Sequence, residues 1–481
     1  MPGRLRAAID SFLKFRDELA IQNIRWELWP VLLVLPLTVI MGDLRFLDLE
    51  INIAGFQTYE LLMFPLGLGC LVTALVPKRL ILPALRAAAV LSALILPLEF
   101  LFPTNEYRLP MLMVFHFFNG ICEACAFSLF CFKLNNVERL SAMILIQFYF
   151  GFLFTVCRAF PEVQSAMVKW GGIAVMAAYL AAVFACNNRW HEILSDTEKG
   201  SLTSGLKTDG QAGSGGAVFV IALGAIHYII QCLVNYVEWA DDIVSSMTFG
   251  IGSFASIVLI IIIQLLSNRS AMYSWLLFLA LSLFGLGALI FDSPVTRLPG
   301  SFAYGLGEGL GYIIINYLIG GAIKKSKSMK IFRLYCVVTF VEYFFISGML
   351  TLVFSRFELP NHYLAIGVIM LLCSVCFLLM PLMQKKLFEK DWADGIILTD
   401  IPQYAQAAEE VRQFEAGIGT DFSTREKEVF ALLLKNFTLR QIGLELHISL
   451  NTVKTHYKNI YRKLAINSRG DLLLKFGGKQ D

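Results

Sequence analysis

One stretch near the C-terminus carries side chains that could read double-stranded DNA. Within residues 450–464, apolar residues recur at i, i+4, i+7 and i+11 and predict one buried helical stripe: Val453, Tyr457, Ile460 and Leu464. The residues that then lie away from this stripe are Asn451, Lys454, Thr455, Lys458 and Arg462. In the major groove, lysine can bond guanine acceptors or phosphates, and threonine can contact a thymine methyl group. This face therefore predicts a recognition helix for duplex DNA.

The residues around this helix predict the elements that would hold it. A Ser or Thr followed three residues later by an acidic residue or Gln is a capping box, which marks a helix start. The pattern occurs three times: Ser423 with Glu426, Thr438 with Gln441, and Ser468 with Asp471. A short helix over 439–446, a turn at His447–Ser449 and the helix over 450–464 together form a helix-turn-helix.

The motifs at 424–429, 447–456 and 459–469 resemble the LuxR, or NarL/FixJ, type of DNA-binding domain. The resemblance implies a four-helix domain over 422–481 that binds double-stranded promoter DNA as a homodimer. It implies base contacts from Lys454, Thr455 and Lys458, and places Thr452, His456 and Lys463 near the phosphates. The final helix from Ser468 would supply the dimer contact. The competing interpretation is a basic helical bundle that binds a protein partner.

Most of the chain has the composition of a membrane protein. Of the 481 residues, 57% are hydrophobic and only 16% are charged, against about 25% charged in soluble domains. The formal net charge is +3, but residues 421–481 carry 11 Lys+Arg against 6 Asp+Glu. That segment therefore has a net charge of +5, and the rest of the chain has a net charge of −2. A basic C-terminal module is what a nucleic-acid-binding domain requires.

Hydropathy predicts an all-α, polytopic bundle of about twelve transmembrane helices, because about 20 apolar residues span a bilayer. The predicted spans are 26–42, 56–76, 80–102, 109–132, 140–160, 168–186, 217–237, 243–266, 272–291, 299–323, 331–354 and 362–383. Residues 1–25 are predicted to be a cytoplasmic amphipathic helix. The polar, Gly/Ser-rich segment 187–216 joins two six-helix halves, 26–186 and 217–383. A linker, 384–421, then leads to the DNA-binding domain.

The positive-inside rule predicts the orientation of the spans. Segments expected on one side carry 20 Lys+Arg, and those on the other side carry 5 when Lys169, at the start of the sixth span, is included. This asymmetry places both termini and the 187–216 loop in the cytoplasm, with the helices in the inner membrane. The even number of predicted spans agrees with it.

The two halves resemble each other and the major facilitator superfamily. Leu109-Pro110 recurs as Leu298-Pro299, an offset of 189 residues. Facilitator proteins are built from two such six-helix halves. The segment Val76–Leu80 departs from that family, because it lacks the Gly, Asp and Arg cluster typical of its transporters. This departure disfavours transport.

Several predicted spans carry polar residues at helical spacing, which is costly in lipid and marks candidate functional groups. They form stripes on the fourth, seventh and tenth spans, with one further glutamate in the eleventh. We predict that these helices converge on a cavity for a small-molecule ligand; interhelical hydrogen bonding without a ligand is the alternative. The candidates are His116, Asn119, Glu123, His227, Gln231, Asn235, Glu308, Tyr312, Asn316 and Glu342.

Neither a metal site nor a catalytic centre is predicted. The ten cysteines are scattered, and Cys122 and Cys125 lack the second ligand pair that zinc needs, so we interpret them as small core residues. No cofactor is predicted, and no receiver domain precedes the helix-turn-helix. The leading hypothesis is a one-component transcription regulator that senses a small molecule through its membrane helices. The alternative is a facilitator-like transporter with a fused regulatory DNA-binding domain.

Overall fold

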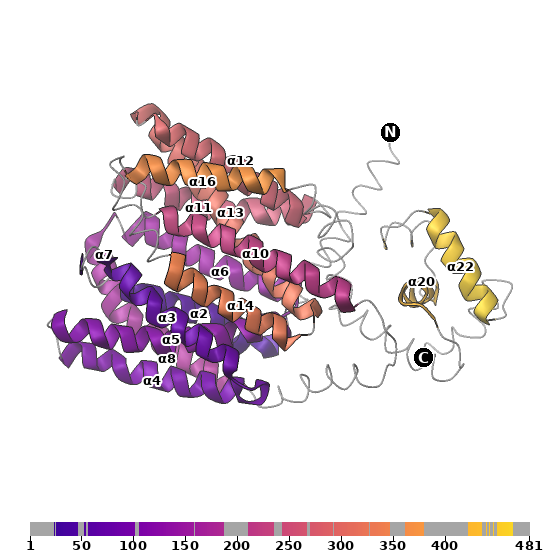
Figure 1. Cartoon of the computed structure of the whole chain (residues 1–481), viewed down its shortest axis with the longest axis horizontal. Coiled ribbons are helices and arrows are strands. Elements are labelled where there is room, and N and C mark those ends of the chain that lie inside the picture. The colour runs from indigo at the N-terminus through magenta and orange to yellow at the C-terminus, as the bar shows by residue number, and fades with distance from the viewer. Residues whose placement is uncertain are drawn as a thin grey trace. The chain divides into compact units, whose positions relative to one another are not determined.

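In the computed structural model the chain forms two compact units, Met1–Ile396 and Ile397–Asp481 (Figure 1). The first is a bundle of long helices and the second holds the predicted DNA-binding helices. The structure describes residues 24, 26–46, 52–53, 56–101, 105–157, 159–186, 210–234, 243–266, 270–291, 293–326, 328–346, 361–379, 422–434, 439, 442, 446 and 450–464.

The helices of the first unit lie side by side along a common direction (Figure 1). Those of the predicted first half are η2 (Trp26–Leu28), α2 (Trp29–Phe46), α3 (Thr58–Leu75), η3 (Lys78–Leu80), α4 (Ile81–Leu101), α5 (Asn105–Lys133), α6 (Asn136–Phe152), η4 (Leu153–Cys157), α7 (Pro161–Ala166), η5 (Met167–Gly171) and α8 (Gly172–Ala185). Those of the predicted second half are α10 (Gly210–Val234), α11 (Ile243–Leu266), α12 (Ser270–Ile290), α13 (Pro294–Ser326), α14 (Met329–Val341), η7 (Glu342–Ile346) and α16 (Asn361–Leu378).

A helix occupies at least part of each of the twelve predicted spans. Within the described ranges, seven helices are long and apolar enough to cross a membrane, and three shorter apolar helices accompany them. The protein is thus a multi-pass membrane protein, while the number of twelve crossings stays a prediction. Large apolar side chains such as Leu94, Phe148 and Phe284 are exposed on the helices, as expected for surfaces that face lipid.

The ends of several helices differ from the predicted spans. Helix α5 begins at Asn105 rather than 109, α13 begins at Pro294 rather than 299, and α10 begins at Gly210, inside the predicted 187–216 loop. Hydropathy marks only the apolar part of a helix, and the backbone hydrogen bonds continue into polar turns beyond it. The sequence therefore underestimated the lengths of these helices.

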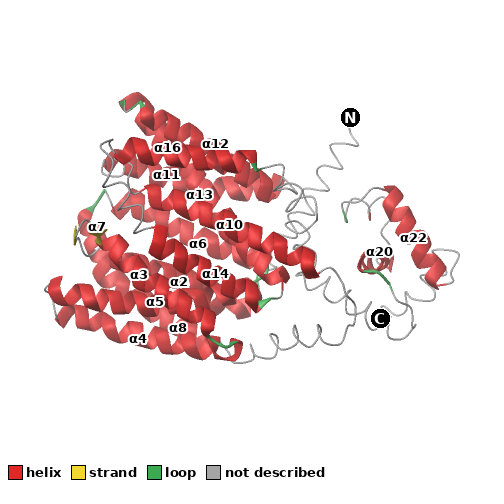
Figure 2. Ribbon diagram, viewed as in Figure 1, coloured by secondary structure: helices red, strands yellow, loops and turns green. Residues whose placement is uncertain are grey.

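A small exception to the all-helical architecture lies between α2 and α3 (Figure 2). Strands β1 (Asn52–Ile53) and β2 (Phe56–Gln57) pair antiparallel, with Asn52 opposite Gln57. The second span was predicted to begin at 56, but helix α3 begins at Thr58 because Phe56 and Gln57 are paired in this hairpin.

Glycines bring two pairs of helices into backbone contact, one pair in each half. A Cβ on Gly69 of α3 would collide with the Phe117 carbonyl of α5, and one on Gly120 of α5 with the Leu66 carbonyl of α3. Gly252 of α11 and Gly305 of α13 approach each other's helices in the same way. Small residues permit such close packing of membrane helices.

These contacts involve the helices that the predicted internal repeat pairs, α5 and α13. The first residues of these helices, Asn105 and Pro294, are also 189 residues apart. Gly309, which follows Gly120 by the same offset, packs against Ser256 of α11. The repeat itself stays a prediction.

The two halves also contact each other through polar side chains. The Gln147 amide of α6 donates to Ser253 of α11, and the Tyr228 hydroxyl of α10 lies 3.9 Å from the sulfur of Met63 in α3.

The nine cysteines whose side chains are described are all buried and free, which confirms their interpretation as core residues.

Candidate DNA-binding face and buried polar side chains

The described part of the C-terminal unit is built around helices α20 (Thr424–Leu434) and α22 (Leu450–Leu464). Val453, Ile460 and Leu464 are buried, and Tyr457 packs against the same core, so the predicted apolar stripe of α22 is confirmed. Tyr461 is buried as well, with its ring centroid 4.0 Å from that of Tyr457. Helix α22 is therefore fixed in rotation about its own axis.

The opposite side of α22 is the exposed face where the sequence places the DNA contacts. Among the predicted contact residues, His456 is half-buried and six side chains are exposed: Thr452, Lys454, Thr455, Lys458, Arg462 and Lys463. The backbone of Asn451 belongs to α22, but its side chain lies outside the description. Exposure is what DNA contact requires, and the contacts themselves stay predictions.

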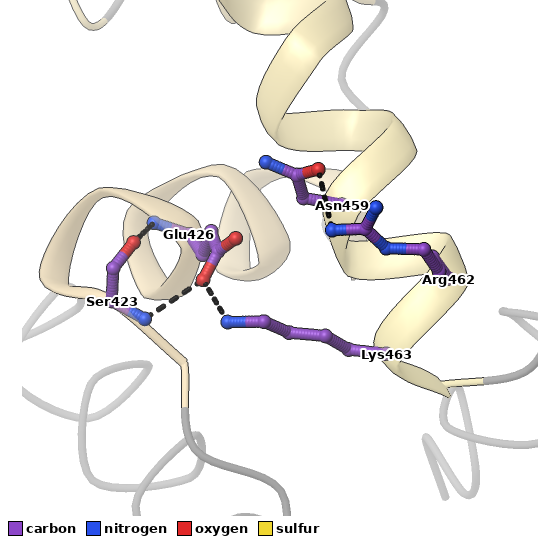
Figure 3. Close-up of polar contacts among 5 residues, drawn as sticks. All are labelled: Ser423, Glu426, Asn459, Arg462 and Lys463. Carbon is purple, nitrogen blue, oxygen red and sulfur yellow. Dashed lines mark hydrogen bonds and ion pairs between the residues drawn. The ribbon is translucent and has the colours of Figure 1, made fainter.

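Lys463, another predicted contact residue, has an ammonium group that contacts residues at the start of α20. Lys463 Nζ lies 2.6 Å from Glu426 Oε2, at the first turn of α20 (Figure 3). It also lies 5.7 Å from the centroid of the Phe422 ring, which is within cation–π range. Lys463 thus joins the end of α22 to the start of α20.

The start of α20 is a capping box, as predicted. The Ser423 N–H donates to Glu426 Oε2 over 2.8 Å, and the Glu426 N–H donates to Ser423 Oγ over 3.3 Å (Figure 3). Burial alone raises the pKa of Glu426, but the hydrogen bonds from Lys463 and Ser423 outweigh it and hold the pKa below its ordinary value of 4.5. Glu426 therefore carries a negative charge at neutral pH.

The other predicted features of this unit lie outside the described residues. These are the Thr438–Gln441 and Ser468–Asp471 capping boxes, the His447–Ser449 turn, and the helix expected from Ser468. Of the second predicted helix only Leu439, Ile442 and Leu446 are described, and the latter two are buried in the core with α20 and α22.

In the membrane unit, the polar stripe on α5 divides into two kinds of side chain. His116 is buried, and its Nδ1 lies 2.9 Å from the Leu112 carbonyl of its own helix, as in ordinary packing. Asn119 is buried too, against Gly42 of α2. Glu123 instead accepts a 3.2 Å hydrogen bond from Tyr343 of η7, which joins the two halves.

The stripes on α10 and α13 meet at one point. His227 Nε2 lies 3.5 Å from Glu308 Oε1, and both side chains are buried. Gln231, one turn after His227, lies beside the same carboxyl group. Asn316 donates to the Tyr312 carbonyl of its own helix over 3.0 Å. Thus His227, Gln231 and Glu308 lie together, while Asn316 bonds within its own helix.

Glu342 and Asn235 are the remaining predicted ligand candidates. Glu342 begins η7 and is 9% exposed; it and Glu123 both lie within electrostatic range of Tyr335 and Cys70. Asn235 lies outside the described residues. No group of three His, Cys, Asp or Glu side chains in the described ranges could hold a metal ion.

Sequence reasoning missed a cluster at the connection between α5 and α6. Asn135 and Glu138 form a reciprocal capping box, which the Asn-x-x-Glu spacing could have revealed. Arg139 is fully buried; its Nη1 donates to the Leu134 carbonyl over 2.8 Å. Lys324 of α13 donates to the same carbonyl over 3.1 Å, so this cluster also joins the halves.

A second missed pair lies deeper in the first half. Tyr149 of α6 donates a 2.8 Å hydrogen bond to Asp43 Oδ2 of α2. These residues are 106 positions apart, and no local spacing signals their contact.

Comparison with solved structures gives a weak likeness for the membrane unit. The crystal structure of the major facilitator superfamily transporter FucP in the outward conformation aligns with 76% of this chain and 99% of its own. Its sequence identity is 14% and its TM-score is 0.42. The facilitator resemblance therefore stays a prediction.

Comparison with known sequences identifies the C-terminal domain. Response regulator protein TmoT of Ectopseudomonas mendocina is 36% identical over 72 residues, 15% of this chain and 32% of its own length, so the chain spans about a third of that relative. Spore germination protein GerE of Bacillus subtilis (strain 168) is 39% identical over 51 residues, 11% of this chain and 69% of its own length. Residues 420–476 match the model of the family described as bacterial regulatory proteins, luxR family. Through this C-terminal domain, the chain belongs to the luxR family of bacterial regulatory proteins.

Proposed function

We propose that the protein is a one-component transcription regulator that senses a small molecule through its membrane helices and binds promoter DNA through its C-terminal domain. One observation carries the proposal: a luxR-family domain and a multi-pass membrane unit belong to the same chain. The family supports transcription regulation. The sensing step and the promoter contacts are the proposal's own.

The DNA contacts we propose are those of the exposed face of α22, with Lys454, Thr455 and Lys458 at the bases. Their support is their exposure opposite a buried stripe, which leaves long cations and a hydroxyl directed away from the core. Asn451, Thr452, His456 and Arg462 flank them on the same helix. The helix predicted from Ser468 would pair two copies, so that a dimer binds the promoter.

The proposed sensing site is supported by the buried polar groups of the membrane unit. The His227–Glu308 pair connects α10 with α13, and the Glu123–Tyr343 bond connects α5 with η7. A charged side chain inside a bilayer costs several kcal/mol unless it is paired or hydrated. A ligand that contacts these groups would change the packing of helices from both halves.

We also propose an inner-membrane location with both termini in the cytoplasm. The support is the excess of Lys and Arg in alternate segments, 20 against 5. This orientation brings the basic domain of residues 421–481 to the side of the membrane where DNA lies.

The DNA-binding half of the proposal is tested with the full-length protein in lipid nanodiscs. A duplex is first enriched from a random-sequence pool by the wild-type protein. Lys454→Ala and Lys458→Ala are each expected to weaken binding by about 1–3 kcal/mol and to lower the salt slope by about one where a phosphate contact is lost. Glu162→Gln, an exposed change at α7, is the control. Unchanged affinity of both lysine variants would exclude this face.

The transporter with a fused regulatory domain remains the second candidate, favoured by the polar contacts between the two halves. Uptake of candidate solutes into proteoliposomes tests it. Uptake that depends on Glu308 would support transport; a transcriptional response without uptake would support the regulator alone.

A further inference from the structure

The last turn of α22 and the first turn of α20 share one buried carboxylate, that of Glu426. Its Oε2 atom accepts the Ser423 N–H over 2.8 Å and lies 2.6 Å from Lys463 Nζ (Figure 3). The Glu426 side chain is 6% exposed and that of Lys463 is 32% exposed. The pair therefore lies at the edge of the core between the two helices.

The position of Lys463 on α22 separates it from Lys454 and Lys458. Each residue turns an α-helix by about 100°, so Lys463 points about 180° away from Lys454 and about 140° away from Lys458. It lies on the other flank of the exposed face, about 20° from Thr452 and from His456. From this flank its ammonium group contacts Glu426 and the Phe422 ring of its own domain.

Arg462 illustrates the contrast within the same turn. It lies four residues after Lys458, about 40° around the helix, and is exposed. Its Nη2 donates to Asn459 Oδ1 over 3.3 Å along the surface of α22 (Figure 3). Arg462 thus lies on the outer side of the helix, while the adjacent Lys463 reaches back to α20.

We propose that Lys463 is a positioning residue and not a phosphate contact, and that its pair with Glu426 sets the orientation of the recognition helix α22 relative to α20. A phosphate contact would require Lys463 to leave a buried carboxylate that its charge compensates. The pair fastens the end of α22, and the apolar stripe fixes its rotation. The Lys463–Glu426 pair and the apolar stripe are both needed for Lys454 and Lys458 to reach the same major groove.

This inference rests on the proposed DNA binding. The positioning role and the phosphate contact of Lys463 predict opposite effects of a Glu426 substitution on DNA affinity. If Lys463 positions α22, removing the charge of Glu426 releases the helix end and weakens DNA binding. If Lys463 binds a phosphate, the same change frees the lysine and removes a negative charge, so binding becomes equal or tighter.

The experiment compares Glu426→Gln, Lys463→Met and the double variant, in full-length protein with the enriched duplex at several salt concentrations. Glutamine keeps the acceptor for the Ser423 N–H, and methionine keeps the length of the lysine stem. Glu428→Gln is the matched control, because Glu428 pairs with Arg425 over 2.5 Å on the surface of the same helix. Lys458→Ala serves as the reference for a lost DNA contact.

We expect each single variant to raise Kd roughly tenfold at every salt concentration, with the salt slope unchanged. The double variant should bind as weakly as either single variant, because each single substitution already removes the Lys463–Glu426 ion pair. Glu428→Gln should bind within about twofold of the wild type.

Two results would overturn the proposal. One is a salt slope lowered by about one in Lys463→Met together with equal or tighter binding by Glu426→Gln; the other is unchanged binding by both variants. Hydrogen exchange of residues 422–434 and 450–464 reports whether each variant is folded. If Lys463→Met is unfolded, the sign of the change in DNA affinity in Glu426→Gln decides between the positioning role and the phosphate contact. Failure of the wild type to enrich any duplex would instead refute the proposed DNA binding itself.

Discussion

Glu426 shows how one side chain can serve both local and long-range structure. Its carboxylate completes the capping box that begins α20, and it also accepts the ammonium of Lys463, 37 residues later in the chain. The capping box was predictable from the Ser-x-x-Glu spacing and is confirmed. The lysine partner was not, because an ion pair between helices depends on how the helices pack.

The charge of Glu426 predicts a pH dependence of stability in the C-terminal unit. Because the folded-state pKa lies below the ordinary value of 4.5, ionisation of Glu426 favours the folded state at any pH above that value. The contribution, roughly 1 kcal/mol, is lost as the pH falls through the folded-state pKa. We expect the wild type to be more stable than Glu426→Gln at pH 7 and the difference to shrink below pH 4.5.

Hydrogen exchange of residues 424–434, compared between the two proteins at each pH, measures this difference and cancels the intrinsic effect of pH on exchange. Glu428→Gln is again the control, because its carboxylate lies on the surface. A stability difference that persists unchanged at pH 3 would contradict the assignment to Glu426 ionisation.

At the scale of elements, the sequence located helices better than it located their ends. Each predicted span contains a helix because lipid offers no hydrogen-bond partners, so an apolar stretch of that length must pair its backbone N–H and C=O groups with one another. The β1–β2 hairpin and the polar first turns of α10 were missed, since neither carries a hydropathy signal. Contacts between helices were missed more often than the helices themselves, as the Asp43–Tyr149 bond shows.

The candidate sites divide in the same way. The exposed face of α22 follows from the period of its apolar residues, so its placement was predictable. His227 and Glu308 are 81 residues apart in the chain, and only the folded bundle shows that the stripes that carry them meet. The Asp43–Tyr149 bond escaped prediction for the same reason.

The glycine contacts between helices give a prediction about the stability of the membrane unit. Gly120→Ala places a methyl group against the Leu66 carbonyl, so α3 and α5 must separate. We expect a loss of about 1–3 kcal/mol, as for overpacking in a core. Gly287→Ala in α12 is the control, because a Cβ there meets nothing within 4 Å. Thermal unfolding in detergent is the measurement, and equal unfolding temperatures for the two variants would contradict the close approach.

On the scale of the whole molecule, polar contacts connect the halves at several levels. The Glu123–Tyr343 bond joins α5 with η7, and Lys324 of α13 binds the Leu134 carbonyl beyond the end of α5. Fully buried Arg139 adds a contact with the Tyr317 ring of α13, 5.9 Å away. A bundle joined in this way can change its arrangement only if several polar contacts change together, which favours discrete states over gradual deformation.

If the membrane unit controls the DNA-binding unit, a change confined to its interior should alter transcription without altering the DNA-binding surface. Glu308→Gln removes the carboxylate beside His227, more than 100 residues before α22. We expect this variant to reach the membrane normally and to change the output of a reporter driven by the enriched duplex severalfold, in either direction, since the substitution shifts the balance of two arrangements. Lys458→Ala should abolish the reporter response in both backgrounds. Glu162→Gln, at an exposed position, should match the wild type. Identical reporter output from Glu308→Gln and the wild type, across a panel of added solutes, would show that the buried pair only packs the helices.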